Sequence, residues 1–320
     1  MSNIRDVAKL SGHSVSTVSR VINNRSYVAS ETKAEILAAM KELNYHPNDI
    51  ARALSTGKTY QVGVVLPYSN HPYFQKLIAA INNVAFKEDY QVMLLPSDYN
   101  AKSEIRYLEM LKHQAFDGLI FTSRAISFEK IMEYQQYGSI TCCEDTLDYP
   151  ISCAYTNKEE LSVQVLQALK QAGFERIGVT VGRDEFSSRS AKAILDSYKL
   201  VFGKPIAEKY LIRNTQYLND GMNAVQTFVD RGADLDIFYA NGDQVAAGVI
   251  HQLKVLGMDI PVIGQDNMDY SYLMNFSTID HKLKEIGEYA FWSLFEKDVI
   301  KKKIPSEFIS RGELKDLVVK

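Results

Sequence analysis

Residues 4–23 read IRDVAKLSGHSVSTVSRVIN, and this stretch decides how the first part of the chain folds. Its apolar side chains recur at helical spacing in two sets, which are Ile4, Val7 and Ala8 and then Val18, Val21 and Ile22. Residues 11–14 read SGHS, which is typical of a turn, and Ser14 can cap the helix that follows. The stretch therefore predicts two short helices joined by a tight turn.

A third helix is predicted to begin at Ser30, on the apolar stripe of Ile36, Met40 and Leu43. Pro47 ends it, because the residue before a proline disfavours the α conformation. Residues 48–55 are predicted to form one further short helix, and residues 56–58 (TGK) a linker. The first 58 residues thus form one module.

Charge divides the chain at the same place. The whole chain carries a net charge of −3, but residues 1–58 hold eight Lys and Arg against five acidic residues, a net charge of +3. The other 262 residues carry −6. A basic module on an acidic body is one feature of nucleic-acid binding proteins. No apolar run approaches the roughly 18 residues of a membrane span, and the N-terminus lacks the order of a signal peptide, so we expect a cytoplasmic protein with no membrane partner.

Residues 59–320 have a different texture, in which short β-branched runs alternate with helical stretches. This pattern is typical of parallel strands joined by crossover helices. Strands are predicted at residues 61–66, 91–96, 118–122, 139–143, 176–181, 235–240 and 261–264. They are too many for one small sheet, so we predict an α/β fold of two lobes, each a doubly wound parallel sheet, divided near residues 152–157. The lysines at 301–303 are predicted to lie in a solvated turn.

No catalytic or cofactor motif stands out in the chain. We find no glycine-rich dinucleotide loop, no phosphate loop, no HExxH and no Gly-x-Ser-x-Gly elbow. Cys142, Cys143 and Cys153 have no metal-ligand spacing and are predicted to be buried or idle thiols. We therefore expect no enzyme activity, no cofactor and no metal site.

Residues 4–23 closely resemble the helix-turn-helix headpiece of the lac repressor (LacI) family. The resemblance continues through Leu43-Asn44-Tyr45 to residues 50–54 (IARAL), which match the hinge helix of the family. In the body it includes residues 240–248 and 262–267. It implies a two-lobed, periplasmic-binding-protein-like domain that closes on a small molecule.

The predicted recognition helix would enter the major groove of DNA, with its N-terminal side chains facing the base edges. Val15 can pack on a thymine methyl group, Ser16 accepts several bases, and Arg20 can bind guanine with two hydrogen bonds. By resemblance, further residues would bind phosphates: Ser14, Thr17, Ser19, Asn23, Tyr27 and Thr32. The alternative is that some of these hydroxyls only cap helices.

The resemblance also implies that the hinge helix contacts DNA through Ala51 and Leu54. A leucine on this short polar helix has no apolar partner in its own segment, and in the family it enters the minor groove and bends the duplex. The implied assembly is a homodimer on a pseudo-palindromic double-stranded operator. The alternative is that Leu54 is buried against the body. One departure from the family is His13, where an apolar residue is usual; it either packs as a neutral side chain or lies beside the DNA backbone.

The candidate effector site combines charged groups with aromatic walls, which suits a hydroxyl-rich ligand. Asp266 matches the pocket aspartate of the family. Asn241 and Asp243 follow a predicted strand, but Gly242 separates them and leaves open which one reaches the ligand. Tyr73 and Phe74 are predicted pocket aromatics, with ordinary core as the alternative.

The sequence leaves two candidates for the pocket arginine, because the glycine that accompanies this arginine in the family is absent. Arg189 and Arg183 are the two candidates. The chain is therefore predicted to be a sequence-specific repressor controlled by a small molecule, with carbohydrate as the expected class. The alternative is a sugar-binding protein without a DNA function.

Overall fold

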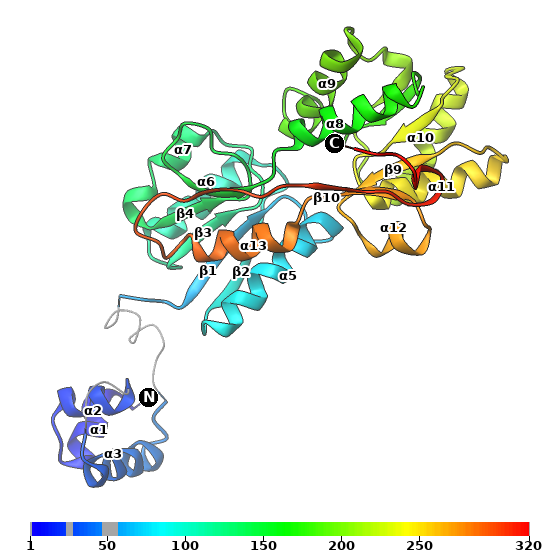
Figure 1. Ribbon diagram of the computed structural model, residues 1–320. Coiled ribbons are helices and arrows are strands. Elements are labelled where there is room, and N and C mark those ends of the chain that lie inside the picture. The colour runs from blue at the N-terminus through cyan, green and yellow to red at the C-terminus, as the bar shows by residue number, and fades with distance from the viewer. Residues whose placement is uncertain (1, 24–27, 47–56, 320) are drawn as a thin grey trace. The chain divides into compact units, whose positions relative to one another are not determined.

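The computed structural model describes residues 2–23, 28–46 and 57–319. The chain separates into two compact units, Met1–Tyr60 and Gln61–Lys320, which we call the headpiece and the body (Figure 1). None of the helices in the described ranges is long and apolar enough to cross a membrane.

In its described residues, the headpiece contains three helices around a small apolar core: α1 (Ile4–Ser11), α2 (Val15–Ile22) and α3 (Ser30–Glu42). Asn3 and Asp6 form a capping box at the start of α1, and Gly12 ends it with a φ of 71°, a conformation that glycine adopts without strain. As predicted, Ser14 caps α2, because its hydroxyl oxygen accepts a hydrogen bond from the Thr17 amide at 3.1 Å. The core is formed by Val7, Ala8, Val18, Val21, Ile36 and Ala39.

The predicted hinge helix lies outside the described residues. The same holds for Tyr27, Ala51 and Leu54, whose assigned contacts with DNA stay predictions.

The body contains two six-stranded sheets, whose strand orders are β11-β5-β4-β3-β1-β2 and β12-β10-β9-β8-β6-β7. All neighbouring strands are parallel except β10 and β12. We call them the sheets of the first and second lobe. The strands are β1 (Gln61–Leu66), β2 (Gln91–Pro96), β3 (Gly118–Phe121), β4 (Ser139–Cys142), β5 (Ser152–Tyr155), β6 (Ile177–Thr180), β7 (Leu211–Ile212), β8 (Ile237–Tyr239), β9 (Val262–Gln265), β10 (Ser277–Asp280), β11 (Lys301–Lys303) and β12 (Glu307–Ile309).

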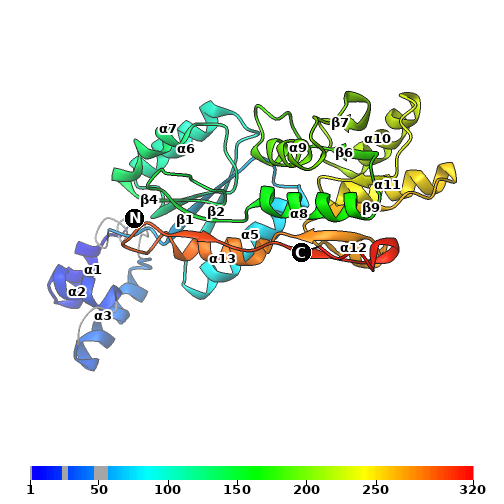
Figure 2. The ribbon, with the colours of Figure 1, turned by 45° about the horizontal axis from the view of Figure 1, so that its top comes forward.

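Helices cover both faces of each sheet (Figures 1 and 2). On the first sheet, α5 and α13 share one apolar core and α6 and α7 another; on the second sheet, α8 and α9 cover one face and α10 and α11 the other. The helices are α5 (Pro72–Lys87), α6 (Ala101–Lys112), α7 (Phe128–Met132), α8 (Lys158–Gln171), α9 (Arg189–Phe202), α10 (Leu218–Asp230), α11 (Asp243–Leu256), α12 (Asp269–Leu273) and α13 (Leu283–Trp292), with short 3-10 turns at Gln135–Tyr137, Glu208–Tyr210 and Gly312–Leu314. The predicted class of two parallel-sheet α/β lobes is confirmed.

The chain crosses between the lobes three times: after β5, after β10 and after β11. These crossings are joined by hydrogen bonds. The buried His281 contacts the Ser306 hydroxyl through Nδ1 at 3.1 Å and Gln265 Oε1 through Nε2 at 3.0 Å, and Ser306 in turn contacts the Thr156 hydroxyl. One network thus joins all three hinge segments.

Two expectations need correction. Lys301–Lys303 is not a turn but the edge strand β11, which pairs with β5. Its three lysines are exposed to solvent, and charged side chains on an edge strand oppose pairing with a further strand. The predicted division near residues 152–157 is confirmed for the first crossing, since β5 ends at Tyr155 and α8 begins at Lys158, but it is incomplete, because the chain crosses twice more, after β10 and after β11. Strands β5, β7, β10, β11 and β12 were absent from the predicted set, since they are only two to four residues long and carry little periodicity. All three cysteines are free and buried, as predicted.

Candidate DNA interface and effector cleft

Helix α2 presents the predicted base-reading side chains on its exposed face. Val15, Ser16 and Arg20 are all exposed, and Val15 keeps 42% of its surface accessible although it is apolar. On the opposite face, Val18 and Val21 are buried in the core. Within the described part of the chain, Arg20 makes no hydrogen bond or ion pair. One face of α2 therefore packs in the headpiece core, and the opposite face is free to bind another molecule.

The hydroxyl groups at the start of α2 contact one another. Ser14 Oγ lies 2.8 Å from both Ser16 Oγ and Thr17 Oγ1, in addition to its capping bond. Farther along, Asn23 Nδ2 donates to the Ser19 carbonyl at 2.9 Å, while its Oδ1 is buried without a hydrogen bond. Capping, which was the alternative for these hydroxyls, is thus observed for Ser14. Hydroxyls that already cap a helix can still donate to a phosphate oxygen.

The two remaining headpiece residues, Thr32 and His13, lie outside α2. Thr32 is half-buried in the first turn of α3. His13 Nε2 lies 2.6 Å from Glu35 Oε2, and the side chains keep 25% and 53% of their surface exposed. His13 therefore connects the turn to α3.

Asp266 lies at the carboxyl end of β9, in the second lobe, where it faces the lobe boundary. It is buried and has a φ of 91°, which is uncommon for a residue with a side chain. Burial raises the pKa of its carboxyl group to about 6, although Lys158 and Lys76 oppose that shift. Lys76, on α5 of the first lobe, donates to the Asp266 and Asn267 carbonyls at 2.9 and 3.0 Å. Asp266 itself makes no side-chain hydrogen bond within the described residues.

Asp243 and Asn241 lie beside Asp266, but their polar atoms are satisfied within the second lobe. The Asp243 carboxylate accepts hydrogen bonds from the Met268 amide at 2.7 Å and the Thr278 hydroxyl at 2.6 Å, and burial raises its pKa to about 7. Asn241 Oδ1 accepts from the hydroxyls of Thr180 and Thr215 at 2.7 and 2.8 Å. Asp243 therefore positions the loop that carries Asp266, whereas Asn241 connects the end of β8 to Thr180 and Thr215.

Tyr73 and Phe74 begin helix α5 in the first lobe. Phe74 belongs to the core, whereas Tyr73 is half-buried and packs at the edge of that core. Lys158 Nζ, from α8 of the second lobe, lies 4.9 Å from the centre of the Tyr73 ring. Burial lowers the pKa of Lys158, although Asp266 opposes this shift. Tyr73 therefore faces a buried cation across the lobe boundary, while Phe74 is ordinary core.

Both candidate arginines reach the first lobe from the second. Arg183 stacks on Tyr99, with its guanidinium carbon 3.5 Å from the ring centre. Arg189 donates to the Asp145 carbonyl and lies 4.0 Å from Glu144. The structure thus does not choose between them.

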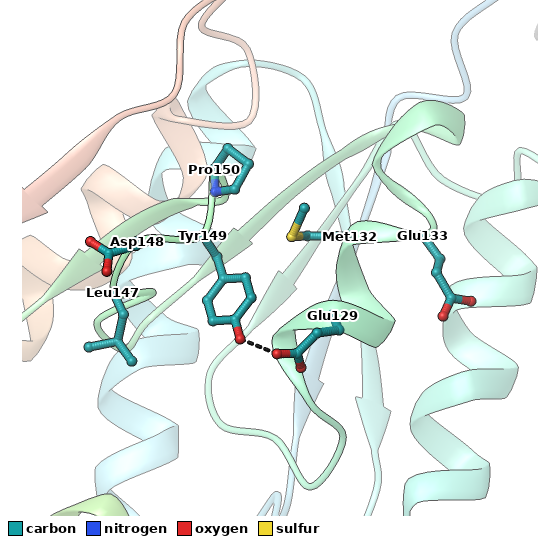
Figure 3. A pocket seen from close by; sticks show the side chains of 7 residues that line it. All are labelled: Glu129, Met132, Glu133, Leu147, Asp148, Tyr149 and Pro150. Carbon is teal, nitrogen blue, oxygen red and sulfur yellow. Dashed lines mark hydrogen bonds between the residues drawn. The ribbon is translucent and has the colours of Figure 1, made fainter.

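The lobes meet closely beside Asp266. The cavity there has a volume of only about 10 Å³, near that of one water molecule, and is lined by His71, Pro72, Gln216, Asn241, Gly242, Asp243, Gln244, Val245, Asp266 and Met268. A ligand of sugar size would require the lobes to move apart. A larger pocket of about 760 Å³ lies elsewhere, between α7 and the 147–150 loop of the first lobe (Figure 3). In Figure 3, Tyr149 donates to Glu129 across its wall.

Sequence reasoning missed four residues that contact the predicted effector residues: Lys76, Tyr99, Glu144 and Lys158. None belongs to a motif, and each comes from a different segment of the chain. The one available signal was that Tyr99 and Glu144 follow predicted strands, whereas Lys158 follows β5, which was not predicted. Residues after parallel strands gather at one edge of a sheet.

Comparison with known proteins matches both units of the chain. A family model described as bacterial regulatory proteins, lacI family, matches residues 3–48, and one described as periplasmic binding proteins and sugar binding domain of LacI family matches residues 59–292. Catabolite control protein B of Bacillus subtilis (strain 168) is 40% identical and covers 93% of this chain and 95% of its own length. The HTH-type transcriptional repressor PurR of Yersinia pestis bv. Antiqua (strain Antiqua) is 30% identical, with 95% and 93% covered.

Solved structures show the same fold over nearly the whole chain. A LacI-family regulator from Silicibacter pomeroyi superposes with a TM-score of 0.83 at 25% identity, covering 98% of this chain and 100% of the other. The lac repressor dimer bound to operator and the anti-inducer ONPF gives 0.82 at 22% identity, with 98% and 99% covered.

Proposed function

Because this chain belongs to the LacI family of bacterial regulatory proteins, a family of DNA-binding regulators and not of enzymes, we propose that it is a repressor whose operator affinity is set by an effector bound between its lobes. The proposed DNA contacts are those assigned above to α2 and the hinge helix. The proposed effector contacts are Asp266, Tyr73 and one or both of Arg183 and Arg189.

The observation that carries the proposal is the state of α2. Its apolar face is fully used by the headpiece core, while Val15 and Arg20 extend from the other face without a partner in the described residues. On this face, the exposed apolar side chain of Val15 suits a thymine methyl group, and the guanidinium group of Arg20, unpaired in the described residues, suits the edge of a guanine.

A homodimer is supported by apolar side chains that the body leaves exposed. Three on or after α13 keep at least 40% of their surface accessible, and so do two on α12. They are Tyr289, Trp292, Phe295, Tyr272 and Leu273. Exposed apolar groups of this number mark interaction surfaces. We propose that a second copy covers them and that the two headpieces then read the two halves of a pseudo-palindrome.

The effector would act through the three crossings. Asp266 directly follows Gln265, and Gln265 belongs to the His281 network that joins all three hinge segments. A ligand that pulls on Asp266 would therefore bias the angle between the lobes. A 100-fold change in operator affinity requires only about 2.7 kcal/mol of differential binding.

The proposal can be tested with the full chain and DNA fragments selected from a random pool. We expect Arg20→Ala to weaken binding of the selected sequence by about 30-fold or more, because each bidentate contact to guanine contributes about 1–3 kcal/mol and the proposed homodimer makes two such contacts. Leu54→Ala should reduce both affinity and DNA bending. Arg106→Ala, on the body surface, is the control. Unchanged affinity in the first two variants would refute the proposed DNA contacts.

A further inference from the structure

The larger pocket of the first lobe lies apart from the cleft. It has a volume of about 760 Å³, and its wall comes from α7, from Glu133 directly after that helix, and from the loop at residues 147–150 (Figure 3). None of its lining residues lines the cavity beside Asp266. Pockets for small molecules usually measure about 300–1,000 Å³. The volume therefore suits a small ligand that binds apart from the cleft.

The apolar part of the wall is exposed and comes from both segments. Met132, at the end of α7, keeps 37% of its surface accessible, and Leu147 keeps 52%. Leu147 also has a φ of 51°, a left-handed conformation that is uncommon for a residue with a side chain. Tyr149 and Pro150 complete this part of the wall. An apolar group bound here would remove both its own surface and that of the wall from water.

The loop is held in place by hydrogen bonds to its neighbours. The Leu147 amide donates to Asp145 Oδ1 at 2.9 Å, and the Leu147 carbonyl accepts from Lys301 Nζ. The Tyr149 hydroxyl donates to Glu129 and so connects the loop to α7 (Figure 3). The two sides of the wall are therefore joined without a ligand. A preformed wall lowers the entropy cost of binding.

The charged groups of the wall are all acidic. Glu129, Glu133 and Asp148 line the pocket, and no lining residue is a lysine or an arginine. Lys130, which does not line it, pairs with Glu133 at 2.6 Å. Glu129 is bonded by the neutral hydroxyl of Tyr149, and Asp148 makes no hydrogen bond or ion pair within the described part of the chain. Among the described residues, Glu129 and Asp148 thus have no cation in contact with them.

Two further cations near the pocket bind other groups. Arg124 Nε lies 3.1 Å from Glu144 Oε1, and the Arg124 guanidinium carbon lies 3.5 Å from the centre of the Phe128 ring. Lys301 is bound to the Leu147 carbonyl. Neither cation is among the lining residues. A ligand in the pocket therefore meets carboxylates and apolar groups but no cation.

We propose that this pocket binds a small organic cation, an amine or a guanidine attached to an apolar chain or ring. Glu129 and Asp148 accept hydrogen bonds from the cationic group, since charge-assisted bonds to carboxylates are stronger than neutral ones. Met132 and Leu147 contact the apolar part of the ligand, and the face of the Tyr149 ring also attracts a cation. An anion is disfavoured, because it meets carboxylates of its own sign. This inference goes beyond the proposed function and does not depend on it.

Methyl NMR of the full chain with ¹³C-labelled methionines tests the ligand class, because Met132 lies in the wall. Met132→Leu assigns its signal. The probes at pH 7 are 2-phenylethylamine, its neutral analogue 2-phenylethanol and its anionic analogue 3-phenylpropionate. We expect the amine to shift the Met132 signal with a Kd of about 1–10 mM, as for other ligands of this size. Its Kd should be at least about threefold lower than that of the alcohol and should rise with added salt.

Two results would overturn the ligand class. Equal affinity for the amine and the alcohol would mean that the apolar surface binds without help from the carboxylates. An unshifted Met132 signal with the amine at about 20 mM, above the expected Kd, would mean that the pocket does not bind this class at all.

Variants then test the residues. Asp148→Asn should weaken amine binding by about threefold and leave alcohol binding unchanged. Asp196→Asn, which removes the same charge from an exposed position on α9, should change neither. An amine preference that persists at full strength in both Asp148→Asn and Glu129→Gln would refute the assigned contacts.

Leu147→Asn tests the apolar wall. Asparagine adopts the left-handed conformation more readily than leucine, so thermal melting should show no loss of stability. We expect the variant to bind both the amine and the alcohol more weakly. Unchanged binding of both probes in a folded Leu147→Asn protein would refute the assigned apolar contact.

Discussion

The headpiece and the cleft differ in how they hold their candidate binding residues: those of the headpiece are exposed, and those of the cleft are largely buried. The proposed DNA contacts of the headpiece are exposed side chains on one short helix, so Val15 and Arg20 need no support beyond the core beneath α2. The cleft instead uses buried charges from both lobes, whose pKa values shift because burial removes water from them. The proposed DNA contacts thus depend on local structure, whereas the cleft keeps charged groups buried at a cost in free energy.

The largest expected effect is a loss of stability in the body that leaves the headpiece unchanged. A Cβ atom on Gly248 would clash with the backbone carbonyl of Leu218, because α10 and α11 approach each other backbone to backbone. We expect Gly248→Ala to destabilise the body by about 3 kcal/mol or more, since backbone cannot move aside as a side chain can. Calorimetry of the full chain should show a lower Tm for the body transition and an unchanged headpiece transition.

His251→Ala, at an exposed position on the same helix, is the control. If Gly248→Ala lowers both transitions together, the headpiece is not the autonomous unit that the comparison requires.

A smaller effect tests how much the buried carboxyl group of Asp266 lowers the free energy of unfolding. The pKa of Asp266 rises from 3.8 to about 6 on folding, so the folded state binds the extra proton between these values. The free-energy cost of burying the ionised Asp266 carboxylate is therefore absent below pH 4 and complete above pH 6. Asp266→Asn should raise the free energy of unfolding at pH 8 by about 1–3 kcal/mol, and this gain should vanish toward pH 4. Urea titrations at both pH values measure it.

Asp269→Asn, at an exposed site on α12, should show no such pH dependence. An Asp266→Asn variant that is less stable than the wild type at pH 8 would mean that Asp266 supports the fold and does not burden it.

The smallest effect concerns His13. Its contact with Glu35 is partly exposed, and exposed ion pairs contribute about 0–1 kcal/mol. We expect His13→Val to change headpiece stability by less than about 0.5 kcal/mol and operator affinity by less than about twofold. Melting curves and gel shifts measure both. A loss above about 2 kcal/mol would give the histidine a structural role that its geometry does not indicate.

The contrast between local structure in the headpiece and contacts between lobes in the body also explains which features could be predicted from the sequence. The headpiece helices, the Ser14 cap and the exposed face of α2 follow from spacing within about 20 residues, where local rules apply. The strand edges that carry Asp266 and Asn241 were also predictable, because parallel strands place their following residues at one edge. The contacts of Lys158 with Tyr73 and of Glu144 with Arg189 were not predictable, since these side chains meet only after the two lobes have packed. Edge strands such as Lys301–Lys303 were missed because their pairing comes from tertiary structure and not from apolar periodicity.

The three crossings between the lobes also govern the order in which a growing chain can fold. The core of the first lobe takes side chains from α13 and from Ile304, near the end of the chain, so its sheet cannot be completed while the ribosome is still producing the second lobe. The headpiece needs only its own first 45 or so residues, and domains that are complete early fold early. A nascent chain should therefore carry a finished DNA-binding module before it has an effector cleft to control it.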